Sequence, residues 1–138
     1  MTNAGKRMKY LGVLVVDGDS AIFAVIERMF SHFNAKIDYA ASSMEALDRL
    51  NTRDYKTMIT NVDMPGVNGR ELSRKARELN PALNIVMFTG NSAEQVLKLA
   101  LDPNKVSEIS EVHLKPSGLG DMLMSILTKE TGKTFLLE

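Results

Sequence analysis

The chain has 138 residues, of which 44% are hydrophobic and 25% are charged, a balance typical of one globular domain and not of a disordered or fibrous chain. The 17 basic and 17 acidic residues give a formal net charge of zero, which argues against a dedicated nucleic-acid-binding protein. The absence of cysteine excludes disulfides, a thiol nucleophile and Cys-ligated metals. The longest apolar runs fall far short of the ~20 residues that span a bilayer, so we expect no membrane association.

Basic residues precede the apolar stretch Tyr10–Val16, an order that also occurs in signal peptides. The stretch is short for a signal-peptide core, and Asp17 and Asp19 follow it closely. A buried first strand is therefore the better interpretation, and we expect the protein to stay in the cytoplasm.

Short apolar runs alternate with segments of helical periodicity along most of the chain. The expected strands are Gly12–Val16, Lys36–Ala40, Thr57–Asn61, Ile85–Phe88 and Glu111–Leu114. The expected helices are Ser20–Phe33, a segment from Ser42 to Leu50, a segment with Leu72, Ala76 and Leu79, a segment from Ser92 to Leu101, and a last helix with Leu119, Met122, Leu123, Ile126 and Leu127. One face of the first helix is expected to carry Ile22, Ile26, Met29 and Phe33. Ser42 and Glu45 form a capping-box pattern.

Strict alternation of strands and helices predicts an α/β fold, with a parallel sheet that is covered by helices on both faces. The doubly wound, flavodoxin-like sheet with strand order 2-1-3-4-5 is the common small solution, because crossovers between parallel strands are right-handed. Residues 10–130 are predicted to form this single domain, between tails at residues 1–9 and 131–138.

Sheets of this kind bind ligands beyond the carboxyl ends of their strands. The polar or flexible residues that follow the predicted strands there are Asp17, Gly18 and Asp19, then Asn61 and Asp63, then Thr89, and finally Lys115. We therefore expect the functional site at this edge of the sheet.

Four segments at these positions, VLVVDGDSA, MITNVDMPGVNG, IVMFTG and HLKP, resemble the motifs of response-regulator receiver domains in their order. The resemblance covers roughly Gly12 to Thr128. It implies a single-domain receiver of a two-component phosphorelay, a signalling module and not an enzyme, with a sensor histidine kinase or another signalling protein as partner. It also implies an output surface on the helix from Ser92, the strand Glu111–Leu114 and the last helix, which would also serve a homodimer.

In this family an acidic pair binds Mg²⁺, an aspartate after the third strand accepts a phosphoryl group, and a hydroxyl and a lysine bind the phosphoryl oxygens. In this sequence, Asp17 matches the first acid of the family, Thr89 matches the hydroxyl residue and Lys115 matches the lysine. Gly18 replaces the second acid, and Asp19 would partly stand in for it.

The phosphoacceptor position carries Asn61, and Val112 replaces the usual aromatic residue three positions before the lysine. A neutral amide cannot form an acyl phosphate and brings no charge to a metal site. Three explanations stay open. The chain is a pseudo-receiver that signals by protein contacts, or Asp63 takes the role of the phosphoacceptor, or an aspartate at position 61 has been mutated to asparagine. Any Mg²⁺ site is expected to be weak and to use Asp17, with Asp19, Asn61 or Asp63 as helpers.

Simpler roles exist for the same residues. Asp19 is best explained as the cap of the first helix, and Asp17 has this alternative too. Lys115 leaves a buried strand and needs an anionic partner, and its bond to Pro116 is a candidate cis peptide. Finally, DGD also resembles the motif of haloacid-dehalogenase-type phosphotransferases, in which Asp17 would be the nucleophile and Asp19 the general acid.

Overall fold

The computed structural model describes residues 11–33, 35–64, 66–90 and 109–131. Its centre is a five-stranded parallel sheet in the order β2-β1-β3-β4-β5, which confirms the predicted topology. The strands are β1 (Leu11–Val16), β2 (Ala35–Ala40), β3 (Thr57–Thr60), β4 (Asn84–Thr89) and β5 (Glu111–Leu114). The described helices are α2 (Ser20–Phe30), α3 (Ser43–Thr52), α4 (Gly69–Leu79) and α6 (Leu119–Thr131). The helix expected from Ser92 lies outside the described residues.

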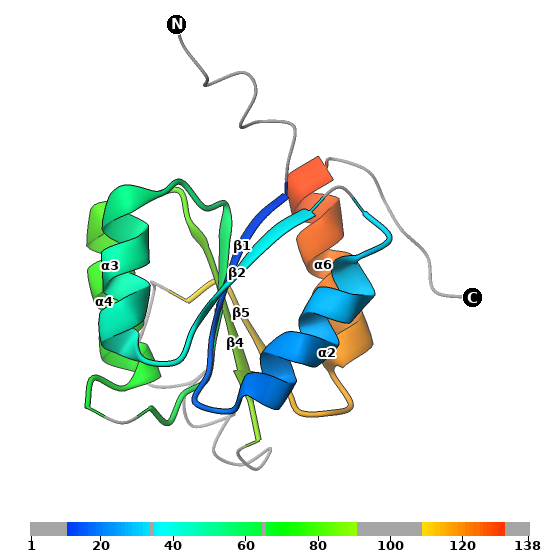
Figure 1. Ribbon diagram of the computed structural model, residues 1–138, viewed down its shortest axis with the longest axis horizontal. Coiled ribbons are helices and arrows are strands. Elements are labelled where there is room, and N and C mark those ends of the chain that lie inside the picture. The colour runs from blue at the N-terminus through cyan, green and yellow to red at the C-terminus, as the bar shows by residue number, and fades with distance from the viewer. Residues whose placement is uncertain (1–10, 34, 65, 91–108, 132–138) are drawn as a thin grey trace, which may run out of the picture.

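The helices cover both faces of the sheet, as the alternating pattern predicts. Helices α2 and α6 lie on one face, and α3 and α4 lie on the other (Figure 1). Side chains of β1 alternate between the two layers: Val13 and Val15 pack with α2 and α6, whereas Leu14 and Val16 pack in the second core. Because both faces are buried, β1 can be apolar throughout.

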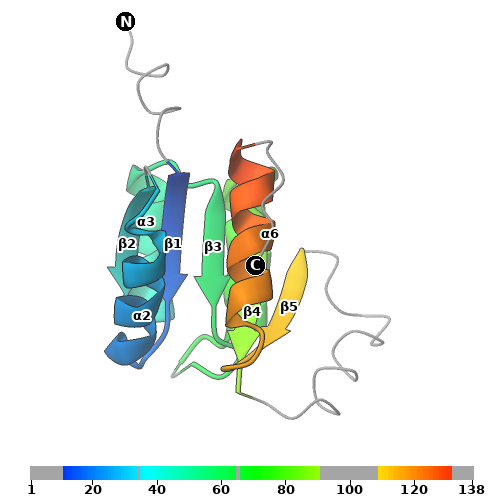
Figure 2. The same ribbon diagram turned by 90° about the vertical axis from the view of Figure 1, so that its right-hand side faces the viewer.

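All strands point the same way, so their carboxyl ends meet at one edge, the lower edge in Figure 2. β1 is an inner strand, with Val15 opposite Tyr39 of β2 on one side and Ile59 of β3 on the other. No helix among the described residues is long and apolar enough to cross a membrane.

Helix starts follow the expected capping chemistry. The Ser42 hydroxyl accepts the Glu45 N–H at 3.2 Å, and the Glu45 carboxylate accepts the N–H of Ala41 at 2.6 Å. Asp19 caps α2, where its carboxylate accepts the N–H of Ala21 at 2.9 Å. The expectation that Asp19 acts as a helix cap is therefore confirmed.

The end of α2 and the exposure of three apolar residues differ from the sequence prediction. Helix α2 ends at Phe30 and not at Phe33, because the Phe33 N–H turns back to the Phe30 carbonyl at 2.9 Å. Met29 and Phe33 are 41% and 38% exposed, so the prediction that they lie on the buried face of the helix is wrong. Phe30 is the buried residue at this end of the helix. Leu79, expected on the apolar face of α4, is 45% exposed at the end of its helix.

Several other bounds differ by one or two residues. β1 and β2 each begin one residue earlier than predicted, β4 is one residue longer at each end, and α3 spans Ser43–Thr52. β3 ends at Thr60, although the Asn61 N–H still donates to the Val16 carbonyl at 3.2 Å. Helix α6 reaches Thr131, one residue beyond the predicted end of the domain.

Candidate functional site

The residues predicted to form the site lie at the shared carboxyl edge of the sheet. Asp17 follows β1, Asn61 follows β3, Thr89 ends β4 and Lys115 follows β5. Backbone hydrogen bonds tie neighbouring positions together, because the Asn61 N–H donates to the Val16 carbonyl and the Lys115 N–H donates to the Thr89 carbonyl at 2.7 Å. The parallel sheet therefore brings together side chains that are far apart in the sequence.

Asp17 and Lys115 form an ion pair at this edge. The Lys115 Nζ lies 2.7 Å from Asp17 Oδ2, and the two side chains are only 17% and 6% exposed respectively. The other carboxylate oxygen of Asp17 accepts the Asp19 N–H at 2.9 Å. The ammonium also lies 5.8 Å from the centre of the Phe88 ring. The anionic partner that Lys115 was expected to need is therefore Asp17.

Tyr39 of β2 is a part of the site that the sequence did not indicate. Its hydroxyl donates to the backbone carbonyl of Asp17 at 2.6 Å, and its ring lies 5.0 Å from that of Phe23. Burial raises the pKa of Tyr39, and the neighbouring Asp17 charge raises it further. Tyr39 thus stays protonated and holds the turn after β1.

Asn61 occupies the central position, half-buried, with its side chain turned to its own backbone. Its Oδ1 accepts the N–H of Val62 at 2.9 Å. The next helix packs tightly on this turn, because the Gly69 N–H donates to the Val62 carbonyl at 2.8 Å. The turn that carries Asn61 is therefore fixed from both sides.

The other predicted acids lie at the rim. Asp19 is exposed and is used as the cap of α2. Asp63 is exposed, and within the described residues it forms no ion pair. Gly18 is also exposed, and a Cβ added there would meet no atom within 4 Å. The place of the missing second acid is thus open to a larger side chain.

Two further predicted positions lie near Lys115. Thr89 is fully buried at the end of β4. Val112 lies in β5 opposite Met87, two positions before Leu114, which is opposite Thr89. The peptide bond between Lys115 and Pro116 is cis, as the sequence suggested.

Residues 13–126 match the sequence model of the response regulator receiver domain. The chain belongs to this family. It is therefore a receiver domain of two-component signalling, and the resemblance of its four motifs is confirmed.

Known relatives support this membership. The sensor protein EvgS of Escherichia coli O157:H7 is 33% identical over 82 residues, which are 59% of this chain but only 7% of that protein. The response regulator receiver protein CpdR of Brucella abortus (strain 2308) is 25% identical over 115 residues, covering 83% of this chain and 92% of CpdR. A CheY-like receiver domain protein from Methanospirillum hungatei JF-1 has a similar structure, with a TM-score of 0.72 and 25% identity over 87% of this chain and 93% of the other.

The donor set of this receiver does not fit a typical Mg²⁺ site. Mg²⁺ takes oxygen ligands in near-octahedral geometry and is usually held by one or two carboxylates. Asp17 is the single buried acid at the edge, and its carboxylate already faces Lys115 and the Asp19 N–H. Among the described residues, no cluster of three or more metal-ligating His, Asp or Glu side chains occurs.

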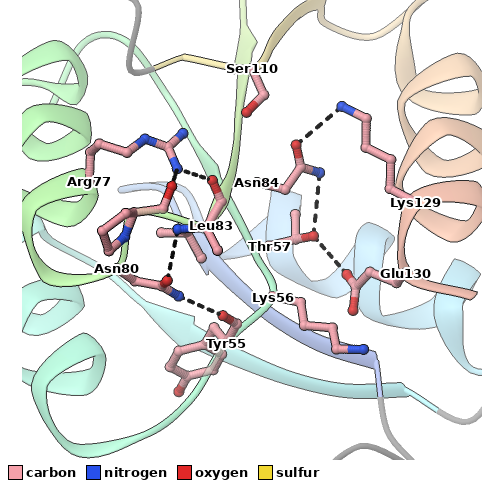
Figure 3. Close-up of a pocket in the computed structure, with 12 residues that line it drawn as sticks. Tyr55, Lys56, Thr57, Arg77, Asn80, Leu83, Asn84, Ser110, Lys129 and Glu130 are labelled. Carbon is pink, nitrogen blue, oxygen red and sulfur yellow. Dashed lines mark hydrogen bonds between the residues drawn. The ribbon is translucent and has the colours of Figure 1, made fainter.

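A hollow of about 760 Å³ lies at the opposite end of the sheet, where the strands begin (Figure 3). Its polar groups bond one another: Lys129 donates to Asn84 at 3.3 Å, Asn84 to Thr57 at 3.4 Å, and Thr57 to Glu130 at 2.7 Å. Arg77 donates to the carbonyl of Leu83. These contacts join α4, β3, β4 and α6, so the hollow is best explained as a structural network.

Proposed function

We propose that this receiver domain is a pseudo-receiver, which acts through protein contacts and does not take up a phosphoryl group at the usual position. The observation that carries the proposal is Asn61, which follows β3 at the edge that also carries Asp17, Thr89 and Lys115. In this proposal Asp17, Thr89 and Lys115 are the retained parts of a phosphoryl-binding site, and they surround a residue that lacks a nucleophilic carboxylate.

The chemistry explains why this residue decides the function. Phosphoryl transfer to a receiver forms a bond between a carboxylate oxygen and phosphorus while the donor's bond to phosphorus breaks. An amide oxygen is a poor nucleophile and carries no charge for a metal ion to orient. In this chain the amide oxygen is also engaged with the Val62 N–H. We therefore infer that Mg²⁺ binds weakly, through Asp17 with Asp19, Asn61 or Asp63.

The partner that we propose is a sensor histidine kinase or another signalling protein, which recognises the folded domain. Its basis is the family itself and the similarity to part of a sensor protein. In this proposal the domain is a binding module and not an enzyme. Asp17 and Asp19 do not favour the haloacid-dehalogenase alternative, because one is paired with Lys115 and the other caps α2.

A phosphodonor experiment tests the proposal. The chain is incubated with acetyl phosphate and MgCl₂, and its intact mass is measured. We expect no phosphoryl adduct on the unmodified chain and partial phosphorylation of Asn61→Asp. Asn51→Asp makes the same amide-to-acid change at an exposed position of α3, and this matched control should gain none.

Asp63 is the residue most able to contradict this. A phosphoryl adduct that forms on the unmodified chain and is absent from Asp63→Asn would mean that Asp63 is the phosphoacceptor in place of Asn61. Release of phosphate from a generic phosphate ester, lost in Asp17→Asn, would instead favour the phosphotransferase alternative.

A further inference from the structure

The charges at the carboxyl edge of the sheet are balanced without a metal ion. Asp17 is 4% exposed and is the only charged residue among the buried residues of the described chain. Its Oδ2 lies 2.7 Å from the Lys115 ammonium, which is itself largely buried. One buried negative charge is thus matched by one positive charge, which is the condition under which burial of both is tolerated.

Three of the side-chain oxygen atoms that a metal ion could use already accept backbone hydrogen bonds. Asp17 Oδ1 accepts the Asp19 N–H, Asp19 Oδ1 accepts the Ala21 N–H, and Asn61 Oδ1 accepts the Val62 N–H, each at 2.9 Å. Gly18 offers no side-chain oxygen. A divalent ion would therefore have to displace the ammonium from Asp17 and would add positive charge to a neutral pair.

We propose that the Lys115 ammonium is the resident cation of this site and competes with divalent metal ions for Asp17. The inference rests on the proposed function, since it is the neutral Asn61 and Gly18 that leave Asp17 as the single buried acid for Lys115 to neutralise. In a site with additional acids, the same lysine and a metal ion would both find negative partners.

The pairing also has a structural consequence. Asp17 follows β1 and Lys115 follows β5, so the ion pair spans the strands that lie between them in the sheet. On the β1 side, Tyr39 holds the Asp17 carbonyl at 2.6 Å. On the β5 side, the Lys115 N–H is held by the Thr89 carbonyl at 2.7 Å. Both partners are thus fixed by backbone contacts, and no metal ion is needed to hold the carboxylate in place.

Mg²⁺ titrations of charge variants test this proposal. The amide spectrum of each protein is followed by NMR during addition of MgCl₂, with the Asp19 N–H as the reporter of the Asp17 carboxylate. We expect Lys115→Met to bind Mg²⁺ at least about tenfold more tightly than the unmodified chain, because a nearby positive charge is removed. Lys115→Arg keeps the charge and should bind as weakly as the unmodified chain.

Lys129→Met is the matched control. Lys129 is also ion-paired, with its Nζ 2.5 Å from Glu111 Oε2, but it lies at the opposite end of the sheet. Its loss should leave Mg²⁺ affinity unchanged. Equal affinities of Lys115→Met and the unmodified chain would overturn the proposal, as would an equal gain in Lys129→Met.

A measurement on the unmodified chain covers the case in which Lys115→Met does not fold. As MgCl₂ is added, the ¹⁵N–¹H signal of the Lys115 ammonium should shift in step with the Asp19 N–H, because an ion that binds Asp17 displaces the ammonium. A shift of the Asp19 N–H with an unshifted ammonium signal would contradict the proposal. The outcome is separate from the phosphodonor test. An adduct on Asp63 would overturn the pseudo-receiver function without changing the Mg²⁺ comparison, and equal Mg²⁺ affinities would leave the phosphodonor result standing.

Discussion

Gly69 approaches the backbone of Asn61 so closely that a Cβ at position 69 would lie 2.1 Å from the Asn61 carbonyl oxygen. This glycine is the first residue of α4, and its N–H donates to the Val62 carbonyl. The start of α4 therefore rests directly on the turn that carries the central residue of the site. A side chain here would move either the helix or the turn.

Gly69→Ala is accordingly expected to destabilise the domain by about 1–3 kcal/mol, the usual cost of inserting atoms into a well-packed region. The free energy of unfolding is measured by urea denaturation. Gly90→Ala is the control, because a Cβ there meets no atom within 4 Å. A midpoint for Gly69→Ala equal to that of the control would show that the turn yields without cost.

Glu130 gives a pH dependence of stability whose sign follows from its position. Its carboxylate accepts the Gly12 N–H at 3.1 Å and the Thr57 hydroxyl at 2.7 Å, and burial raises its pKa above the usual 4.5. The folded state thus binds this proton more tightly than the unfolded state. The resulting stabilisation is present below pH 4.5 and is lost as the pH rises through the raised pKa.

Glu130→Gln should remove this loss, because glutamine can accept from Gly12 and donate to Thr57 without becoming charged. The free energy of unfolding is compared for both proteins between mildly acidic and neutral pH. We expect the advantage of Glu130→Gln to grow with pH. Glu78→Gln, a change at an exposed glutamate of α4, should follow the unmodified chain. A difference that stays constant with pH would contradict the assignment.

Tyr55 gives a second prediction about pH, because its hydroxyl donates a hydrogen bond to Asp38 Oδ2 at 2.5 Å. Burial and the Asp38 carboxylate raise the pKa of Tyr55 to about 12. In an ultraviolet titration, Tyr55→Phe should therefore lose the phenol that ionises near this value. The lost hydrogen bond to a charged group should also cost about 1.5–3 kcal/mol of stability. An unchanged high-pH phase in Tyr55→Phe would assign it to another tyrosine.

Val112 leads to a prediction about dynamics. Val112 lies in β5 and pairs with Met87 of β4. In the family, this position carries an aromatic residue that moves with the switch hydroxyl. Valine has no polar tip and too little bulk for this movement, so we expect β5 and α6 to occupy one conformation. Relaxation-dispersion NMR on the isolated domain should detect no exchange there. Two populated conformers at β5 and α6 would refute the prediction.

The sequence predicted the topology, and the edge of the sheet at which the candidate residues lie, because both depend on local order along the chain. Apolar strands, capping residues and polar residues at strand ends lie next to each other in the sequence, and the parallel sheet then assembles them. Lys115 was expected to need an anion for the same reason, since it directly follows a strand. Its pairing with Asp17 follows from the fold and its register.

Features that depend on distant contacts could not be predicted in this way. The Tyr39 hydroxyl and the Glu130 carboxylate find backbone partners more than twenty residues away in the sequence, with separations of 22 and 118. No local pattern indicates which backbone group a side chain will meet after packing.

Gly18 leads to the last prediction, which concerns restored phosphorylation. A Cβ added at position 18 would meet no atom within 4 Å, so Gly18→Asp should introduce the missing second acid without a clash. Combined with Asn61→Asp, it should increase Mg²⁺-dependent phosphorylation beyond that of Asn61→Asp alone, as measured by intact mass after acetyl phosphate treatment. The added acids repel one another and Asp17 when no cation is bound. The double variant should therefore unfold at lower urea concentration in EDTA and regain stability in MgCl₂, since a ligand that binds only the folded state stabilises it. If Mg²⁺ left the stability of the double variant unchanged, these acids would not form a metal site, and the loss of receiver chemistry in this chain would have to lie beyond Gly18 and Asn61.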